Sequence, residues 1–426
     1  MSHILKDVLI DGLNGMYRLA TIYIENGLIA RIDSSEIHIH DIGCAKFYVT
    51  CGFVNSHIHP NQLSDRRMLD GLPISQLLSI MHTQHKKTDE DRYAQAICVL
   101  IDALKSGATS MYAIASNPVP AIRAFKDLDL TGAISCVFND VWEGEGNTPS
   151  QTNLVDVENQ FAEFYKYNSD DLKIHIGSAS ILTASNDLLL LFDDISKRYN
   201  TRVNIHMSEG RDCVEKCLQN RGFTPVRLLA HLDVLNERWN LIHATTVDDV
   251  EVQLIADSGA TITHCPVSNA KTGVGIAPMK AFHASDVTIG LGTDACSNNN
   301  TNNILNEAYF AMLLQSALHK DPALFTIDTV FEWMTTNGLK IIDSAKSGKL
   351  EVGQRADVLL WDLSVPAFTP LAHGRLKSVL INNAPDVKPH TVLVNGNVVI
   401  ENFTFVGTAE AKALQAVNAW SRESCG

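Results

Sequence analysis

The sequence contains no long hydrophobic run. No apolar stretch approaches the roughly 18 residues that a membrane-spanning helix needs, and the first residues, MSHILKDVLIDGLNG, mix acidic with apolar side chains. They also lack the basic region and the small-residue cleavage site of a signal peptide. We therefore expect neither a membrane partner nor a secretory signal.

Clusters of positive charge are missing as well. The chain carries 34 Lys and Arg against 48 Asp and Glu, a net charge of -14, and its basic residues are scattered. Nucleic acids and anionic membrane surfaces attract clustered basic side chains. A nucleic-acid partner is therefore not expected.

The nine cysteines form no recognisable framework. Their number is odd and their spacing irregular, and only Cys213 and Cys217 lie close together, with three residues between them. This is not the spacing of a zinc knuckle. Reduced thiols in a cytoplasmic protein are the simplest interpretation.

Short β-type segments are present at both ends of the chain. Residues 1–50 alternate apolar and polar side chains, and Glu25–Gly27 is a hairpin signal, because Asn-Gly adopts the positive φ angles of a type I′ turn. The pattern returns in residues 346–405, again with an Asn-Gly turn. Neither end has enough strands for its own sheet, so together they predict one small composite β-sandwich domain. In residues 406–426 the apolar spacing predicts a C-terminal helix.

Residues 51–345 have a different pattern, in which short apolar runs are separated by longer segments of helical periodicity. Alternating strands and helices are typical of parallel βα units with buried strands. The eight runs are residues 52–59, 108–114, 132–138, 172–178, 202–209, 240–245, 261–267 and 288–294. Eight such units predict a (β/α)8 barrel, an α/β fold of the TIM type. A doubly wound open sheet is the alternative, but it usually shows a Gly-rich phosphate turn after its first strand, and HIHPNQ is not one.

Side chains that bind metal ions stand at the ends of these predicted strands. They are, in chain order, His57 and His59, His206 and Glu209, His243, and Asp294. In a barrel the carboxyl ends of all strands meet at one face, where the active site lies. A single histidine on an apolar strand is usually a core residue. Such side chains at the same end of four predicted strands favour a metal site.

Several segments also resemble those of a known family. GFVNSHIH, HMSE, IHAT, HCPVSNAKTGVGIAPMKAF and GLGTDACSNNN occur in the order found in the amidohydrolase superfamily. The branch they resemble holds cytosine, guanine and S-adenosylhomocysteine/methylthioadenosine deaminases and the triazine chlorohydrolases and aminohydrolases. LEVGQRADVLLWDL and TVLVNGNVV resemble that family's composite β-sandwich. The resemblance covers essentially the whole chain and is much more specific for superfamily and branch than for substrate.

The resemblance implies a mononuclear centre in which His57, His59, His206 and Asp294 bind one divalent ion, Zn2+ or, as the alternative, Fe2+. The chemistry of the residues agrees, because three imidazoles, a carboxylate and a water leave one position open for a nucleophile, as in catalytic zinc sites. Lys173 stands at the start of its predicted strand and is not placed to bridge a second ion.

The implied activity is that of a metal-dependent hydrolase, specifically an aminohydrolase (deaminase) that releases ammonia from a small nitrogen heterocycle. Bound Zn2+ lowers the pKa of its water to about 7, and the resulting hydroxide would attack an electron-poor ring carbon. Glu209 is the predicted proton shuttle from that water to a ring nitrogen, a role worth roughly 10²–10⁴-fold in rate. His243 is predicted to orient the hydroxide or stabilise developing charge, with ligation of the metal as the weaker option. Asp294 would also accept a proton from the attacking water.

Substrate contacts are less clearly indicated. Gln62 stands where similar ring deaminases carry a glutamine that touches the heterocycle. Cys296 and Ser297 follow the last predicted ligand, at a place where the family varies with substrate, and we expect them to bind substrate too. His264 and Asn269 match family motifs and are interpreted as residues that shape the pocket wall.

The sequence departs from its relatives where those recognise a purine or a ribose. Ala179 stands where adenosine-type deaminases carry a ring-contacting histidine, and residues 139–153 contain no arginine of the kind that would hold a ribose. An unpaired buried polar group costs about 1–3 kcal/mol, so the polar edges of a purine would be poorly matched. We expect an unusual substrate, or contacts from elsewhere, such as Arg66 and Arg67.

Two further classes stay open. A hydrolase of the same fold would displace chloride or an alkylamine, or open a cyclic amide, and the metal centre does not exclude it. A non-catalytic amidohydrolase-like scaffold would need a lost ligand or a lost Glu209, and all of these residues are present. The sequence does not state the substrate, the native metal, or whether the chain forms a homo-oligomer such as a dimer or tetramer.

Overall fold

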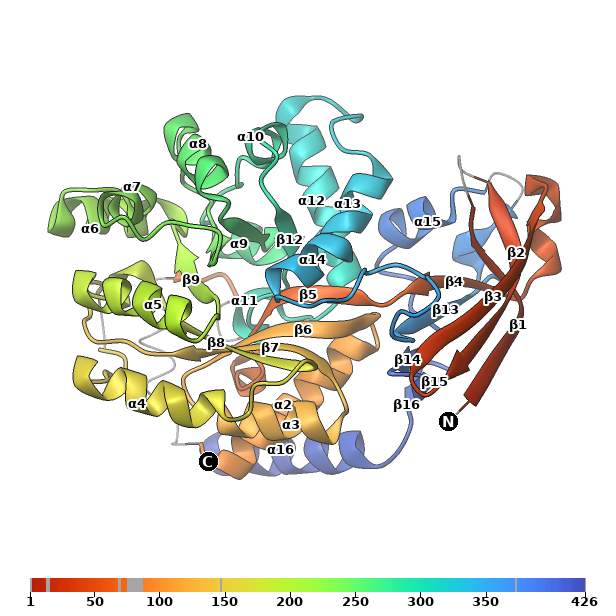
Figure 1. Ribbon diagram of the computed structural model, residues 1–426, viewed down its shortest axis with the longest axis horizontal. Coiled ribbons are helices and arrows are strands. Elements are labelled where there is room, and N and C mark those ends of the chain that lie inside the picture. The colour runs from red at the N-terminus through yellow and green to blue at the C-terminus, as the bar shows by residue number, and fades with distance from the viewer. Residues whose placement is uncertain are drawn as a thin grey trace.

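Two eight-stranded sheets organise the chain. The computed structural model describes residues 2–12, 16–67, 70–74, 87–145, 148–371 and 374–425. One sheet uses the middle of the chain and is surrounded by helices, and the other, beside it, is built from both ends (Figure 1).

The central sheet is a nearly closed parallel barrel. Its strands are β5 (Phe53–Ile58), β6 (Ala108–Ala115), β7 (Thr131–Val137), β8 (Leu172–Ser178), β9 (Val203–Met207), β10 (Trp239–His243), β11 (Thr261–His264) and β12 (Ile289–Leu291). They pair in chain order, and a parallel bridge between Ile58 and Asp294 joins the last strand end to the first. The predicted (β/α)8 barrel is confirmed, and each predicted strand is present.

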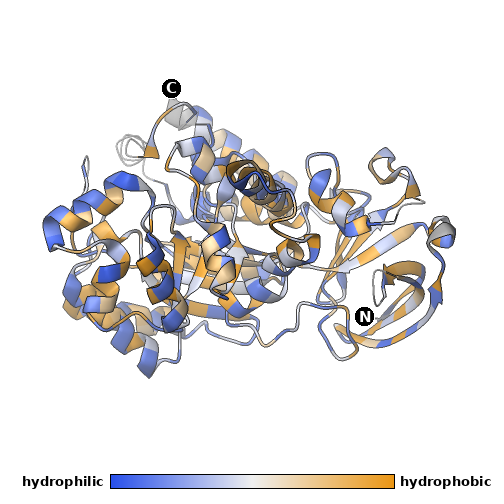
Figure 2. Ribbon diagram, turned by 90° about the horizontal axis from the view of Figure 1, so that it is seen from above, coloured by the Kyte–Doolittle hydropathy of each residue, from blue (hydrophilic) through white to orange (hydrophobic). Residues whose placement is uncertain are grey.

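Helices cover the outside of the barrel, so its strands are buried on both faces. Every residue of β5 and β6 is buried, and apolar residues dominate the central strands in Figure 2. This explains why the strands appear in the sequence as continuous apolar runs. The covering helices are α2 (Asp89–Leu104), α3 (Val119–Asp127), α4 (Leu154–Tyr165), α5 (Asn186–Arg198), α6 (Gly210–Arg221), α7 (Pro225–His231), α8 (Asp249–Ser258), α9 (Pro266–Thr272), α10 (Met279–Ala284), α11 (Cys296–Asn299), α12 (Ile304–His319), α13 (Ile327–Trp333) and α14 (Thr336–Ile341).

Local signals set where some of these helices begin. At the start of α2, the Thr88 hydroxyl accepts from the backbone N–H of Asp91, and the Asp91 carboxylate accepts from the backbone N–H of Thr88. Asp248 and Glu251 form the same capping box at the start of α8. Each box satisfies two donors that the first turn of a helix leaves without a partner.

The second sheet joins the two ends of the chain. Its strands are β1 (Ser2–Asp11), β2 (Tyr17–Glu25), β3 (Leu28–Ile37) and β4 (Phe47–Cys51), then β13 (Val358–Asp362), β14 (Thr391–Val394), β15 (Asn397–Glu401) and β16 (Thr404–Phe405). The halves meet where β4 pairs antiparallel with β13. Apolar side chains of both halves share one core, which includes Ile22, Val49 and Val358. Both ends therefore build one β domain, as predicted, while the boundaries at residues 50, 345 and 405 stay predictions.

The two predicted Asn-Gly turns lie against each other in this domain. Asn26 and Gly27 have φ angles of 51° and 79°, and Asn395 and Gly396 have 51° and 72°, as a type I′ turn requires. A Cβ atom on Gly27 would lie 2.4 Å from Oδ1 of Asn395. Only glycine permits this approach, so the two hairpins restrain each other's position.

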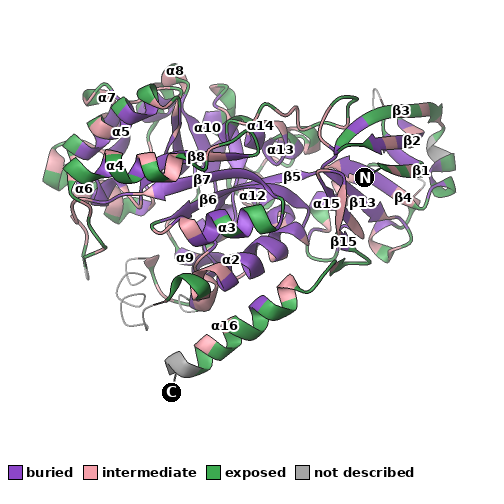
Figure 3. Ribbon diagram, turned by 60° about the horizontal axis from the view of Figure 1, so that its bottom comes forward, coloured by how far each residue is buried: buried purple, intermediate pink, exposed green. Residues whose placement is uncertain are grey.

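Two further helices are α15 (Leu376–Asn382), which precedes β14, and α16 (Ala409–Cys425), which follows β16. Short 3-10 turns lie at Ile39–Cys44, Leu63–Asp65, Ile181–Thr183 and Pro366–Phe368. Helix α16 lies on the outside of the barrel, mostly exposed (Figure 3), and is tied to α2 by an ion pair of 2.5 Å between Glu410 and Lys105. Among the described helices, none has the length and apolar character needed to cross a membrane.

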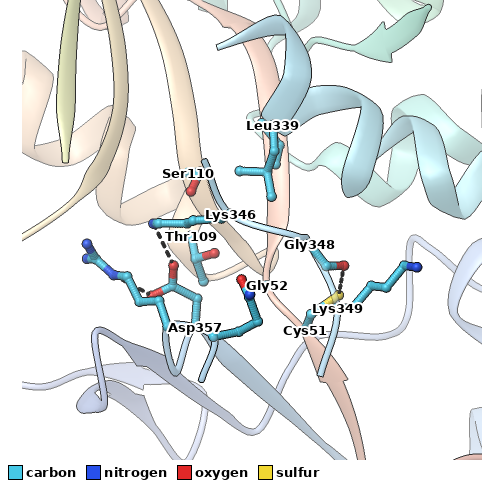
Figure 4. Close-up of a pocket in the computed structure, with 12 residues that line it drawn as sticks. Cys51, Gly52, Thr109, Ser110, Leu339, Lys346, Gly348, Lys349 and Asp357 are labelled. Atoms are coloured by element: carbon cyan, nitrogen blue, oxygen red, sulfur yellow. Dashed lines mark hydrogen bonds and ion pairs between the residues drawn. The ribbon is translucent and has the colours of Figure 1, made fainter. Parts of the chain in front are cut away.

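A buried charge network connects the β domain to the barrel. Asp357, just before β13, accepts hydrogen bonds from Lys346 Nζ at 3.1 Å, Arg355 Nε at 3.2 Å and the backbone N–H of Asn395 at 2.8 Å. Arg355 also pairs with Asp171, just before β8. Figure 4 shows Lys346 reaching Asp357 beside a cavity of about 30 Å³. Burial lowers the pKa of Lys346, so its charge depends on the Asp357 carboxylate.

Asp357→Ala is expected to lower the free energy of unfolding by roughly 3–5 kcal/mol, because it leaves the Lys346 ammonium buried without its partner. Urea unfolding followed by circular dichroism measures this. Asp33→Ala is the control, since the Asp33–Arg31 pair is more than half exposed and should be worth less than about 1 kcal/mol. Equal losses in the two variants would contradict the proposed importance of the buried pair.

Candidate metal centre

Three histidine rings and one carboxylate converge at the carboxyl end of the barrel. His57 lies in β5, His59 just after it, His206 in β9, and Asp294 just after β12. His57 Nε2 is 3.1 Å from Nε2 of both His59 and His206, and 3.2 Å from Asp294 Oδ1. One ligand atom of each residue lies within 4.8 Å of all the others. The fold thus brings together side chains separated by more than 230 residues of sequence.

These atoms are spaced as the ligands of one small ion. Two nitrogen ligands at 2.0–2.1 Å from a tetrahedral zinc ion lie roughly 3.3 Å apart, close to the 3.1 Å between the histidine nitrogens. Hydrogen bonds alone do not satisfy the cluster, because an imidazole nitrogen carries at most one proton. His57 Nε2 faces two other imidazole nitrogens and one carboxylate oxygen. A cation bound between these atoms would attract the lone pairs of all of them, so the donor set fits a metal ion.

The protonation states of the cluster also suit a metal. Burial lowers the pKa of His57 to about 4 and the pKa of His206 well below its usual value, so both rings keep a free lone pair at pH 7. Burial alone would raise the pKa of Asp294, but hydrogen bonds from His57 and His59 hold that pKa well below its usual range. Neutral imidazoles and an ionised carboxylate are the forms that bind divalent ions.

Two polar side chains hold the second oxygen of Asp294. Its Oδ2 accepts hydrogen bonds from Ser268 Oγ at 2.5 Å and from Asn298 Nδ2 at 2.9 Å. Ser268 belongs to α9 and Asn298 to α11. Sequence reasoning did not identify either residue as part of the site, although both lie inside the motifs that carry the family resemblance.

Glu209 and His243 lie beside the four ligand atoms. His243 Nδ1 pairs with Asn269 Oδ1 at 2.8 Å, which leaves its Nε2 3.6 Å from Glu209 Oε1. Neither of these two facing atoms has a hydrogen-bond partner among the described residues. Burial raises the pKa of Glu209. A carboxylate and an imidazole with free lone pairs therefore border the ligand cluster, and Asn269, expected only to shape the wall, orients the imidazole.

The backbone is strained at three of these strand ends. Ser208, His243 and Asp294 have φ angles of 48°, 74° and 63°. Residues other than glycine rarely adopt positive φ angles, which cost energy and cluster at functional sites. Ser208 follows β9, His243 ends β10 and Asp294 follows β12. The strained residues therefore include the predicted ligand Asp294 and His243, and Ser208 lies two residues after the predicted ligand His206.

A cavity of about 470 Å³ opens at the ligand cluster. This is a size that binds small molecules. Besides His59, His206, Glu209, His243 and Asp294, its wall includes Gln62, whose buried Oε1 has no hydrogen-bond partner among the described residues. The position of Gln62 agrees with the expected substrate contact, which stays a prediction.

Two of the expected substrate contacts are not on this wall. Cys296 and Ser297 are fully buried, and the cavity is lined by Ala295 and Asn298 instead. Because both side chains are fully buried and neither is among the described residues that line the cavity, this part of the prediction is corrected. Arg66 does not reach the cavity either, because its guanidinium donates to Asp102 at 3.1 Å.

Ser268→Ala is expected to weaken metal binding roughly 10–100-fold, because hydrogen bonds to a ligating carboxylate hold it in place for the ion. Competition between the protein and a chromophoric chelator for Zn2+ measures the affinity. Ser364→Ala, a control on an exposed turn of the β domain, should leave it unchanged. Unchanged affinity in Ser268→Ala would show that the Asp294 carboxylate does not need this hydrogen bond.

Curated proteins of similar sequence are deaminases. The chain is 26% identical over 400 residues to the 5-methylthioadenosine/S-adenosylhomocysteine deaminase of Caldicellulosiruptor saccharolyticus, covering 92% of this chain and 90% of that protein. It is 27% identical over 397 residues to the enzyme of the same name from Pyrococcus furiosus, covering 92% and 93%. These relatives lie in the branch that the sequence motifs indicated.

Solved structures of the same fold, and a family match, complete the comparison. An adenosine deaminase from Xanthomonas campestris with bound zinc superposes with a TM-score of 0.86 at 19% identity, over 99% of both chains. The atrazine chlorohydrolase of Arthrobacter aurescens complexed with zinc gives 0.85 at 20% identity, over 97% of this chain and 100% of that one. Residues 48–399 match the amidohydrolase family. The chain therefore belongs to the amidohydrolase family.

Proposed function

We propose that this protein is a metal-dependent aminohydrolase that releases ammonia from a small nitrogen heterocycle, and that His57, His59, His206 and Asp294 bind its single divalent ion. One observation carries the proposal: four ligand atoms within 4.8 Å of one another adjoin Glu209 in a cavity of about 470 Å³. The deaminase activity named for the curated relatives supports the same reaction class.

Each residue of the cavity has its own role in the proposed reaction. A divalent ion held by the four ligands would supply a water activated for attack at neutral pH. Glu209 takes a proton from that water and delivers it to a ring nitrogen, while His243, turned by Asn269, orients the water through Nε2. Asp294 accepts the second proton as the carbon–oxygen bond forms and the carbon–nitrogen bond breaks. The amine then takes that proton and leaves as ammonia, with Gln62 holding the ring.

We propose Zn2+ as the native ion, with Fe2+ as the alternative. Three imidazoles and a carboxylate around an open position are typical of catalytic zinc sites, and zinc is bound in solved structures of the same fold. Elemental analysis of the purified protein separates the two ions.

We also propose that the enzyme acts in the cytoplasm on a small molecule, with no nucleic-acid or membrane partner. The eight cysteines whose side chains are described form no disulfide, which supports a reducing compartment. A measurement of the protein's mass in solution gives the number of subunits.

Ammonia release tests the reaction class. The zinc-loaded protein is assayed against amino-substituted purines, pyrimidines, pterins and triazines, and against cyclic amides. Chelator-sensitive ammonia from an amino-heterocycle is the expected result. Release of chloride or alkylamine, or ring opening of a cyclic amide without ammonia, would instead assign the metal centre to the other hydrolase class.

Substitutions are expected to separate metal ligands from the proton shuttle. His57→Ala and Asp294→Asn should lose activity and bound metal while the protein stays folded. Glu209→Gln should keep the metal and lose roughly 10²–10⁴-fold in kcat. Metal content, circular dichroism and kcat are compared with those of Glu163→Gln, a control on the exposed side of α4. Full activity in any of the first three variants would refute its assigned role.

The pH dependence of kcat/KM is expected to reflect Glu209. Burial raises the pKa of this carboxyl above the ordinary value of 4.5, and only its ionised form accepts a proton from water. Activity should therefore fall as the pH drops through this raised pKa, which puts the acidic limb of the profile above pH 4.5. A profile that is flat down to pH 4.5 would contradict a buried Glu209 base.

A further inference from the structure

One wall of the cavity indicates what kind of substituent the substrate carries. This wall is built by residues of β6 and β7 and by the segments that follow β7 and β8, and it includes the indole ring of Trp142. We propose that Trp142 forms a binding platform for an uncharged, apolar substituent on the amino-heterocycle, and that the site disfavours a sugar or an anionic group. The inference rests on the proposed function for the identity of the reacting ring.

The side chains around Trp142 on this wall are mainly apolar. Ile114 and Val137 come from β6 and β7, and Ala179 and Leu182 from the segment after β8. Together with the indole ring they present carbon atoms to the cavity. Apolar surface that a ligand buries against them contributes favourably in proportion to its area.

Trp142 is held firmly against its own segment. A Cβ atom built on Gly144 would lie 2.2 Å from the indole ring, so the ring packs directly on this glycine. The backbone N–H of Glu143 donates to the carbonyl of Leu182 at 2.9 Å, and the Glu143 side chain pairs with Arg221 of α6 at 2.9 Å. A platform that is already ordered binds a ligand with a smaller loss of entropy.

Two buried polar side chains of this wall, Asn139 and Thr183, are occupied within the protein. Asn139 Oδ1 accepts from Ser178 Oγ at 3.0 Å and from the backbone N–H of Ala179 at 3.1 Å. Thr183 Oγ1 accepts from the backbone N–H of Ser180 at 2.9 Å and bonds Ser178 Oγ at 2.7 Å. A sugar hydroxyl placed beside Asn139 or Thr183 would therefore lose water without gaining an equivalent partner.

Among the described residues that line the cavity, the wall also offers no unpaired lysine or arginine to an anionic group. Lys216 lines the cavity but pairs with Glu145 at 3.1 Å, and no arginine lines the cavity among the described residues. A phosphate or carboxylate on the ligand would meet Glu145 and Asp212 instead. Like charges repel, so these two carboxylates disfavour an anionic ligand.

Buried polar atoms without partners lie near the metal ligands instead. Among the described lining residues they include Gln62 Oε1, Glu209 Oε1 and His243 Nε2. The indole N–H of Trp142 is also buried without a hydrogen-bond partner among the described residues. The cavity thus recognises a polar ring at the metal end and an apolar group along Trp142.

Matched ligand pairs test this division. Adenine, cytosine and diaminotriazine are each prepared with an n-butyl group or with a 2,3-dihydroxypropyl group of similar size, and their binding to zinc-loaded Glu209→Gln protein is measured by calorimetry. For the ring that binds most tightly, the butyl ligand should bind roughly tenfold or more tightly than the dihydroxypropyl ligand. Equal or tighter binding of the dihydroxypropyl ligand, or no binding of any butyl ligand, would overturn the inference.

Substitutions in the same background assign the preference to the indole. Trp142→Ala should weaken the butyl ligand roughly tenfold and the dihydroxypropyl ligand less than about threefold, while Trp142→Phe keeps most of the preference. In Gly144→Ala the added Cβ displaces the ring without removing it, so this variant should weaken the butyl ligand as Trp142→Ala does. Agreement between the two variants shows that the loss in Trp142→Ala does not come from misfolding. Tyr167→Ala, an exposed aromatic outside the cavity, is the control. Equal losses for both ligands would refute the role of Trp142.

The same ligands separate this inference from the proposed function. Ammonia release by the wild-type zinc-loaded protein is measured on each pair. If the butyl preference is present in binding but no ammonia appears from any amino-heterocycle, the proposed reaction is wrong while the binding platform stands. If ammonia is released without a preference for the butyl member in either binding or kcat/KM, the platform is wrong and the reaction stands.

Discussion

A buried cluster of four ligand atoms within 4.8 Å of one another is suited to a cation, and much of the barrel mouth is arranged around this cluster. Burial keeps His57 and His206 neutral, whereas hydrogen bonds keep Asp294 ionised. Ser268 and Asn298 donate to Oδ2 of that carboxylate, so its Oδ1 is the oxygen directed at the ligand cluster. Metal binding and ordering of this end of the barrel are therefore coupled, because the same atoms determine both.

The β domain contributes to this arrangement although it lies at the other end of strand β5. Strand β4 leads directly into β5, and the backbone N–H of Gly52 between them donates to the carbonyl of Asp357 at 2.9 Å. At the far end of β5, the backbone N–H of Asp294 donates to the carbonyl of His57 at 3.0 Å. The strand that carries His57 is thus fixed at its start by the β domain and at its end by another ligand residue. Such restraint at both ends keeps a ligand within the narrow geometry that a metal site needs.

The sequence predicted the features that depend on local periodicity and on strand position. The eight strands are visible as apolar runs, and the rule that strand ends share one face predicts that His57, His206 and Asp294 meet. Contacts between loops that follow different strands have no such local signal, so Ser268 was missed as a partner of Asp294, and Trp142 as part of the wall. Cys296 and Ser297 were misjudged for a related reason. The cavity is lined by Ala295 and Asn298, three residues apart on one face of a short helical turn, and adjacency to a ligand does not reveal that face.

Catalysis and substrate choice are physically separable in this cavity. The free polar atoms of Glu209, His243 and Gln62 lie at the metal end. On the other wall, the carbonyl oxygen of Asn139 already accepts hydrogen bonds from Ser178 and Ala179. No described hydrogen bond connects these two groups of residues. A change in the segments after β7 and β8 would therefore alter the group proposed to fit beside Trp142 without disturbing the ligand geometry or Glu209, the proposed proton shuttle. This explains how an intact metal centre coexists with the loss of residues that bind a ribose in related deaminases, since the two rely on different parts of the fold.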